Sequence, residues 1–301
     1  MRPIKLIASL AFAFFFASVP AFGAAEPEGE LGTEDHPILW AMAPEGEEPP
    51  AVAELTEHIH ERTGIVVQPV PVATELEVLE ALAADPAGAH MTILSAVPYL
   101  IAAERGGLEP ALIAVRNGAG SYATQIIAHA DTEAESLAEL ELADLGFARP
   151  DAQSAGGWMV PSLMMRAAGL DPAELGDITD LGTHAAVIEA IYEREAELGA
   201  VHLGGLEPLA AEFEDLEERI VVLAESPQIP NEGLQFAPEV SEEHRDQIVN
   251  ALLQLIETPE GAELIRRLYS WDALDAATEE AYDDLRELIR DAEIPFDEIM
   301  E

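Results

Sequence analysis

The segment that decides the fold spans residues 37–72 and contains two apolar stretches, PILWAM at 37–42 and IVVQPVPV at 65–72. Between them, apolar residues recur at helical spacing, and Gly64 follows as a typical helix end. A buried strand, a helix and a second strand are therefore predicted in succession. Units of this kind with short connections favour an α/β fold with a mostly parallel sheet that carries helices on both faces.

The same alternation continues outward from this segment, and a second unit starts near Thr124. Residues 241–301 are almost wholly helical in pattern, and the chain contains no internal repeat. Further strands are predicted at 91–94, 125–129, 145–148, 178–181, 200–202 and 220–224, and helices at 50–63, 75–84, 98–105, 136–140, from near 158 or 161 to 169, and 185–197.

The chain of 301 residues is strongly acidic, with 59 Asp and Glu against 14 Lys and Arg and a formal net charge of −45. Nucleic-acid binders need a basic footprint, so that class of function is excluded. Cysteine is absent, which excludes disulfides, thiolate metal sites, cysteine nucleophiles and a lipid-modified cysteine.

The first 23 residues are typical of an export signal. Arg2 and Lys5 precede an apolar stretch at 6–19, which is short for a membrane span, and small residues follow at a suitable cleavage site near Gly23. An uncleaved anchor is the alternative. Residues 24–36 are rich in Glu, Gly and Pro and are expected to form a flexible leader. No later stretch is long and apolar enough to span a membrane, so the mature protein is predicted to be soluble and exported.

Without residues 1–23 the net charge becomes −47, from 12 arginines against 59 acidic residues. Such a surface repels itself at low salt, whereas at about 1 M salt the screening length falls to roughly 3 Å. We therefore predict a halophilic protein that is exposed to brine, with an acidic protein lacking salt adaptation as the alternative.

The loop at 151–157 is the most informative local feature, because it follows a predicted strand, contains Gly156, Gly157 and Ser154, and opens a helix. Amides at a helix start lack acceptors within the helix and can bind a small oxyanion without a cationic side chain. The alternative is an ordinary glycine-rich turn in which Ser154 caps the helix. The loop matches neither the P-loop nor the dinucleotide-binding motif.

Two further residues are candidates for the same site. His184 stands at a predicted helix start after an apolar strand, and Tyr122 lies just before the strand that enters the second unit. A surface or capping role for His184 is the alternative. His58 and His60 point to different faces of a helix, so they favour no metal site, and no residue pair has the spacing of a catalytic nucleophile and base.

Several motifs in a fixed order extend these observations. Together they resemble the periplasmic solute-binding proteins of phosphate/phosphite/phosphonate ABC importers, over about residues 38–295. The motifs are ILSAVPYLIA at 93–102, GAGSY at 118–122 followed by QII at 125–127, DAQSAGGWMVP at 151–161, GTHAAVI at 182–188 and ESPQIP at 225–230.

This resemblance implies a two-lobed periplasmic binding protein fold of type II whose chain crosses the hinge twice. Lobe 1 would comprise about residues 27–125 plus 236–301, and lobe 2 about 126–235. The implied function is capture of a small oxyanion between the lobes and its delivery to an ABC permease in the inner membrane. The resemblance implies a periplasmic monomer without catalytic activity, metal or cofactor.

The resemblance also implies which residues bind the ligand. Tyr122, Ser154 and His184 match positions that hold phosphonate oxygens in the family, Tyr99 lies in the family's strand-turn-helix motif, and Glu232 falls near a family aspartate. The main-chain amides of residues 154–157 are expected to be the principal donors. Four positions depart from the family pattern and remove side-chain ligand contacts, namely Glu75, Ala155, Gly156 and Gly205.

Other functions remain open on the sequence alone. A binding protein of this kind could present its closed form to a membrane receptor kinase instead of a permease, or bind a different small polar solute. An exported enzyme is the least favoured class.

Overall fold

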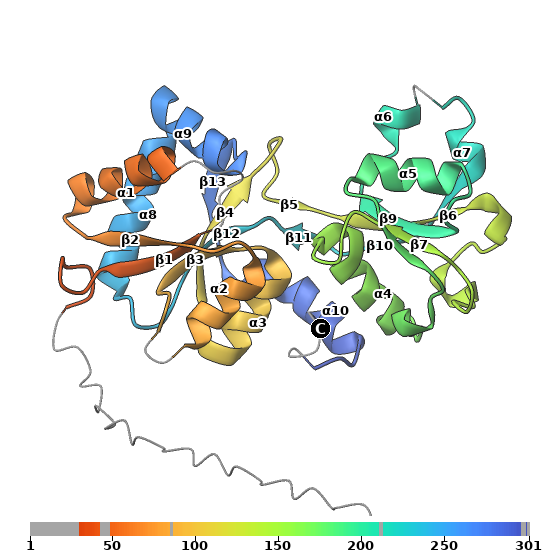
Figure 1. Cartoon of the computed structure of the whole chain (residues 1–301), viewed down its shortest axis with the longest axis horizontal. Coiled ribbons are helices and arrows are strands. Elements are labelled where there is room, and N and C mark those ends of the chain that lie inside the picture. The colour runs from red at the N-terminus through yellow and green to blue at the C-terminus, as the bar shows by residue number, and fades with distance from the viewer. Residues whose placement is uncertain (1–29, 43–48, 85–86, 211–212, 296–298, 300–301) are drawn as a thin grey trace, which may run out of the picture.

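The computed structural model describes residues 30–42, 49–84, 87–210, 213–295 and 299, and it consists of two lobes joined by a hinge (Figure 1). The predicted export signal at 1–23 and the first part of the leader lie outside the described residues. Residues 30–36 differ from the expected flexible leader. They form a turn in which the Gly32 amide donates to the His36 carbonyl at 2.7 Å, and Val66 of lobe 1 donates to the Gly32 carbonyl at 2.7 Å.

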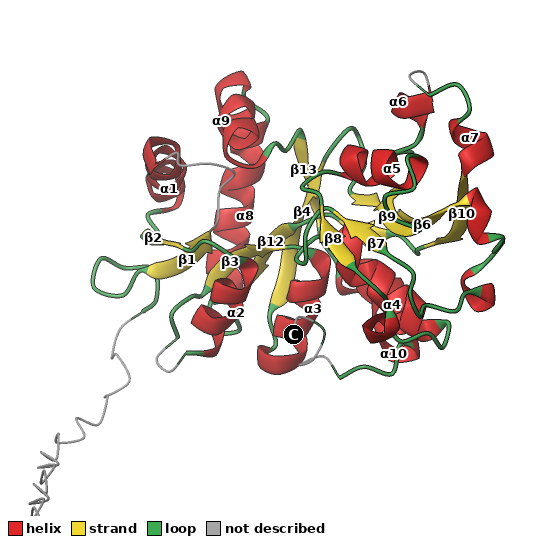
Figure 2. Ribbon diagram, turned by 45° about the vertical axis from the view of Figure 1, so that its right-hand side comes forward, coloured by secondary structure: helices red, strands yellow, loops and turns green. Residues whose placement is uncertain are grey.

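Lobe 1 is a six-stranded sheet with helices on both faces (Figure 2). Its strands, in spatial order, are β13 (Ala273–Ala276), β4 (Glu109–Val115), β12 (Gly233–Phe236), β3 (Met91–Leu94), β1 (Ile38–Met42) and β2 (Val67–Pro71). One face packs against α1 (Pro49–Thr63), α8 (Glu242–Ile256) and α9 (Pro259–Tyr269), and the other against α2 (Glu75–Ala83) and α3 (Ala96–Gly106).

Lobe 2 is a five-stranded sheet that is also covered on both faces. Its strands, in spatial order, are β10 (Ile220–Glu225), β6 (Thr124–His129), β9 (Leu198–His202), β7 (Phe147–Arg149) and β8 (Ile178–Asp180). Its helices are α4 (Val160–Ala167), α5 (His184–Tyr192), α6 (Glu207–Ala210) and α7 (Leu216–Arg219), with a π-helical turn at Ala155–Met159 and 3-10 turns at Ala130–Thr132, Leu137–Glu139 and Pro172–Glu174.

Both sheets are mixed, which corrects the expectation of mostly parallel sheets. In lobe 1, β1 pairs in parallel with β2 and β3, whereas β12 is antiparallel to β3 and β4. In lobe 2, β7 is parallel to β8 and β9, whereas β6 is antiparallel to β9 and β10. The hinge explains the antiparallel pairs. In lobe 1, β4 carries the chain out and β12 brings it back, and in lobe 2, β6 and β10 do the same, so the members of each pair run in opposite directions.

The two strand crossings expected at the hinge are present. β5 (Ser121–Tyr122) and β11 (Ile229–Pro230) form a two-stranded antiparallel ribbon between the lobes, in which Tyr122 pairs with Ile229.

The C-terminal segment adds a third link between the lobes. After β13, the chain continues through a 3-10 turn at Glu279–Tyr282 into α10 (Asp283–Asp291), which packs against α4 of lobe 2. Leu285 and Ile289 of α10 are fully buried in a hydrophobic cluster that includes residues of both lobes. All of residues 236–301 were expected to belong to lobe 1, whereas α10 packs against lobe 2. The segment 241–301 was also expected to be almost wholly helical, and the strand β13 interrupts it.

Candidate ligand-binding site at the hinge

The site lies at one edge of the lobe 2 sheet. Because β7, β8 and β9 are parallel, their carboxyl ends share an edge, and the residues that follow them there include Ser154, His184 and His202. Strand β6 runs the other way, so its first residue, Thr124, pairs with His202. The topology therefore brings together at the hinge most of the lobe 2 residues expected from the sequence.

The loop after β7 opens a helix that begins with the π turn and continues into α4. The Ser154 hydroxyl accepts a hydrogen bond from the Gly157 amide at 3.0 Å, and the Ser154 carbonyl accepts one from Trp158 at 2.9 Å. Thr124 fixes the loop to the sheet, since its hydroxyl contacts the carbonyls of Gly156 and, at 2.8 Å, Val201. Ser154 thus acts as the helix cap that the sequence offered as the alternative to a ligand-binding role.

The amides of Ala155 and Gly156 are the donors of this helix start that remain without a partner in the part of the chain that the structure describes. The aromatic ring of Tyr122 lies against them, because a β-carbon at position 156 would be 3.1 Å from Tyr122 Cε2. Only glycine allows the ring to lie this close without a shift.

Tyr122 presents a hydroxyl that has no hydrogen-bond partner among the described residues. Burial raises the pKa of Tyr122, the charges of Glu232 and Glu75 raise it further, and Arg116 opposes them. The phenol is therefore protonated over the whole physiological range and is a hydrogen-bond donor beside the amides of Ala155 and Gly156.

Lobe 1 presents a carboxylate to the same space. Glu75, at the first position of α2, accepts hydrogen bonds from the amide of Ser95 at 2.6 Å and from its hydroxyl at 2.9 Å. Ser95 is the N-cap residue of α3, so Glu75 occupies the anion position at the start of that helix. Burial raises the pKa of Glu75 and the charge of Glu232 adds to this, whereas the bonds from Ser95 oppose the shift.

Glu232 lies at the same hinge, and its charge is compensated. It forms an ion pair with Arg116 and accepts a hydrogen bond from Trp271 Nε1 at 2.6 Å. Arg116 also donates to the Tyr269 carbonyl at 2.9 Å. Arg116 and Trp271 were missed by sequence reasoning. The position of Arg116, directly after the strand that leads to the hinge, was the available signal.

Two histidines flank the helix start on the lobe 2 side. The ring of His184, at the first position of α5, meets that of His202 edge-on with centroids 5.0 Å apart. Burial lowers the pKa of His184, and His202 lowers it further. Gly205 makes room for His202, since a β-carbon there would lie 3.3 Å from its ring atoms. His202 was not identified from the sequence, although it ends a strand predicted to reach this edge.

The hydroxyl of Tyr99 is bound within the protein. Its side chain is fully buried, its hydroxyl donates to Glu279 at 2.7 Å, and its ring packs on Tyr282 with centroids 4.4 Å apart. Tyr99 therefore joins α3 to the segment that leads into α10, and its hydroxyl is engaged by Glu279.

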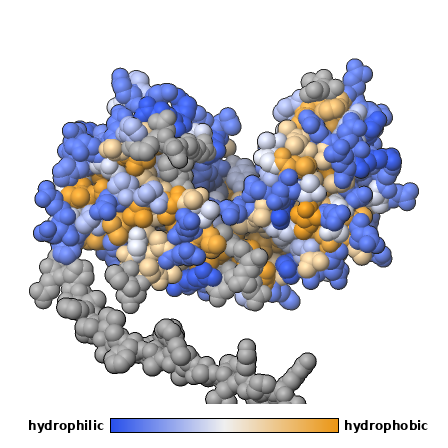
Figure 3. Space-filling model, in the orientation of Figure 1, coloured by the Kyte–Doolittle hydropathy of each residue, from blue (hydrophilic) through white to orange (hydrophobic). Residues whose placement is uncertain are grey.

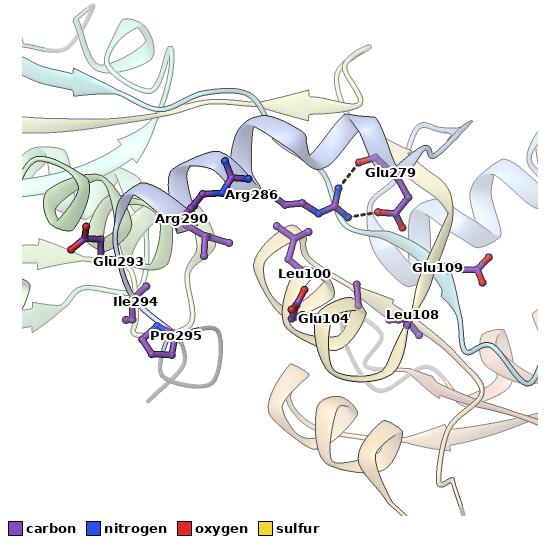
Figure 4. A pocket seen from close by; sticks show the side chains of 13 residues that line it. Leu100, Glu104, Leu108, Glu109, Glu279, Arg286, Arg290, Glu293, Ile294 and Pro295 are labelled. Carbon is purple, nitrogen blue, oxygen red and sulfur yellow. Dashed lines mark hydrogen bonds and ion pairs between the residues drawn. The ribbon is translucent and has the colours of Figure 1, made fainter.

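A cavity lies elsewhere, between α3 and α10 (Figure 4). It measures about 740 Å³, and residues that line it include Leu100, Glu104, Glu279, Arg286 and Arg290. None of the residues that the sequence suggested for ligand binding lines it, so it is a separate feature. The surface is also hollowed between the two lobes (Figure 3).

The described residues contain no cluster of three or more His, Asp or Glu side chains suited to a metal ion. Nor is any helix in the described ranges both long and apolar enough to cross a bilayer.

Several solved structures are similar to this chain in fold at low sequence identity. The binding-protein component of a phosphonate ABC transporter from Pseudomonas aeruginosa has 17% identity and a TM-score of 0.56, covering 85% of this chain and 86% of its own. A Xanthomonas citri protein bound to ATP has 14% identity and a TM-score of 0.64, covering 85% and 96%. A Prochlorococcus marinus protein in complex with methylphosphonate has 13% identity and a TM-score of 0.55, covering 84% and 97%.

These likenesses establish the two-lobed periplasmic binding protein fold. No curated protein sequence matches the chain significantly. One family, described as the periplasmic phosphonate substrate-binding protein of ABC transporters, matches residues 44–282. The chain therefore belongs to this family, and it is a periplasmic binding protein rather than an enzyme.

Proposed function

We propose that the protein captures a small oxyanion of the phosphonate, phosphite or phosphate type between its lobes and delivers it to an ABC permease. The observation that carries this proposal is the helix start at Ala155 and Gly156, whose amides have no acceptor among the described residues and against which the ring of Tyr122 lies, with its hydroxyl unpartnered. Amides and a phenol supply donors without a cation, as an oxyanion site in an acidic protein requires.

The arrangement around this helix start supports the same conclusion. His184 and His202 lie at the same sheet edge, and the buried Nδ1 of His184 has no hydrogen-bond partner among the described residues. The β5–β11 ribbon holds Tyr122 between the lobes, so rotation about the hinge would bring lobe 1 toward the ligand. Closure would remove water from the ligand and so strengthen each short hydrogen bond.

The test is calorimetric titration of the purified protein with phosphate, phosphite and methylphosphonate in about 2 M NaCl, where long-range repulsion is screened. At least one of them should bind, and Tyr122→Phe should weaken that binding. A hydrogen bond to a charged group contributes about 1.5–3 kcal/mol, so the expected loss is roughly 10- to 150-fold.

Tyr192→Phe is the matched control. The Tyr192 hydroxyl donates to Asp215 at 2.6 Å in lobe 2, away from the hinge. This variant should bind the ligand like the unchanged protein. Equal affinity of Tyr122→Phe and Tyr192→Phe would contradict the proposed site, and absence of binding by all three anions would contradict the proposed ligand class.

A further inference from the structure

Tyr122 lies near the starts of two helices, one from each lobe. In lobe 1, a carboxylate of the protein itself lies at the start of α3, because both oxygens of Glu75 accept hydrogen bonds from Ser95. In lobe 2, the amides of Ala155 and Gly156 have no such carboxylate among the described residues. An oxyanion bound by the amides of Ala155 and Gly156 would therefore have the Glu75 carboxylate of lobe 1 near it.

The two sides are close enough to interact. Helix α3 packs against the turn Ala155–Met159. Tyr122 contacts Gly156 through its ring, and its hydroxyl feels the charge of Glu75. A negative charge placed beside Tyr122 would consequently be repelled by Glu75.

The other charged groups that face Glu75 do not remove this repulsion. Glu232 is a second carboxylate in the same space, and it adds negative potential at Glu75. Arg116 is committed to the ion pair with Glu232. Ser95 already gives both of its donors to Glu75. A proton is the remaining means of neutralising the Glu75 carboxylate, and burial already favours its protonated form.

We propose that Glu75 sets the charge of the ligand: the hinge site takes a singly charged oxyanion, and it admits a doubly charged one only together with a proton on Glu75. This inference rests on the proposed function. It makes Glu75, at the position where the resemblance leads one to expect a tyrosine, the specificity-determining residue of the site.

The experiment compares the unchanged protein with Glu75→Gln and with the control Glu80→Gln, which changes an exposed carboxylate on the same helix. Glutamine can keep the contact with Ser95, since its oxygen accepts from the amide and its nitrogen donates to the hydroxyl. Binding of methylphosphonate, phosphite and sulfate is measured by calorimetry near pH 5.5 and pH 8, in buffers of different ionisation enthalpy.

We expect Glu75→Gln to bind sulfate and the doubly charged form of methylphosphonate about tenfold or more tightly than the unchanged protein near pH 8. The unchanged protein and Glu80→Gln should take up more protons on binding than Glu75→Gln does. Protonation of the ligand itself is common to all three proteins and cancels in this comparison.

Melting curves without ligand provide an independent reading. A carboxyl group with a raised pKa in the folded state stabilises the fold most at low pH, and this contribution is lost as pH rises from the ordinary value of 4.5 to the raised one. Glu75→Gln should therefore gain stability relative to the unchanged protein as pH rises through this window, and Glu80→Gln should not.

Equal binding, equal proton uptake and equal pH dependence in all three proteins would overturn the role of Glu75 while leaving the proposed function intact. Weaker binding of the doubly charged anions by Glu75→Gln would also overturn it. Failure of every oxyanion to bind to any of the three proteins would overturn the proposed function, and this inference with it.

Discussion

At the scale of single residues, the close contact between Tyr122 and Gly156 governs the geometry of the site. The ring can lie over the helix start only because position 156 has no side chain, and the hydroxyl of Tyr122 is held beside the free amides as a result. The family pattern has a serine at this position according to the resemblance. The glycine thus exchanges a hydroxyl donor for the approach of an aromatic ring.

Gly156→Ala should move the Tyr122 ring by a few tenths of an ångström and weaken ligand binding by roughly tenfold, with little change in melting temperature. Alanine is a better helix former than glycine, so the fold itself tolerates the change. Calorimetry and thermal melting measure the two effects. Gly106→Ala is the control, because a β-carbon there meets nothing within 4 Å. Unchanged affinity of Gly156→Ala would contradict the importance of this contact.

The sequence predicted part of this site. The loop at 151–157 and His184 each follow a predicted strand. Because the carboxyl ends of parallel strands lie at one edge of a sheet, the sequence alone predicts that the two are neighbours. The bond between Glu75 and Ser95 could not be predicted, since it depends on α2 and α3 covering the same face of the sheet. The spatial strand order β3-β1-β2 is not written in the local sequence.

At the scale of the elements, α3 is bound to the C-terminal segment through Tyr99. The hydroxyl of Tyr99 donates to Glu279, and Arg286 forms an ion pair with the same carboxylate. Burial raises the pKa of Tyr99, so its hydroxyl remains a donor at every pH of interest. This contact fastens the segment before α10 to lobe 1, while α10 itself packs on α4 of lobe 2.

Tyr99→Phe should lower the free energy of unfolding by about 0.5–1.5 kcal/mol, because the exposed Glu279 loses one donor and keeps its ion pair with Arg286. Ligand affinity should change much less than in Tyr122→Phe, since the Tyr99 hydroxyl points to Glu279 rather than to the hinge site. Denaturant unfolding and calorimetry give the two values. The opposite result, a large loss of affinity at unchanged stability, would restore Tyr99 as a ligand-binding residue.

The elements that were predicted are those with strong apolar patterns. β1, α2, β3 and β6 are examples, and each contains buried apolar residues at strand or helix spacing. β13 lies in a segment that was expected to be helical. Its sequence, ALDA, has only one buried residue and so shows no apolar strand pattern. This strand is defined by its pairing with β4 rather than by its own composition.

At the scale of the whole molecule, the dominant property is the excess of negative charge. The ion pairs of the described residues join arginines or histidines to acidic side chains, but acidic residues outnumber lysine and arginine by 59 to 14. Most carboxylates must therefore be balanced by solvent ions. Burial and packing favour the fold, whereas long-range repulsion opposes it at low ionic strength.

The melting temperature should rise steadily as NaCl is increased from low concentration to about 1 M and beyond, because the screening length shortens from about 30 Å at 0.01 M to roughly 3 Å. For a chain of this size, each kcal/mol of stability gained corresponds to about 2–4 °C. Glycerol, which carries no charge, is the control for general solvent effects. A flat or falling melting temperature in NaCl would contradict adaptation to salt.

The position of α10 across both lobes has a consequence for ligand affinity. The affinity of a protein that must close around its ligand depends on how often the closed form is populated beforehand. Because α10 rests on α4 and is anchored to α3 through Glu279, any change in the angle between the lobes must be accommodated along this helix. Substitutions in α10 that touch no ligand can thus tune affinity from a distance, by shifting the balance between open and closed protein.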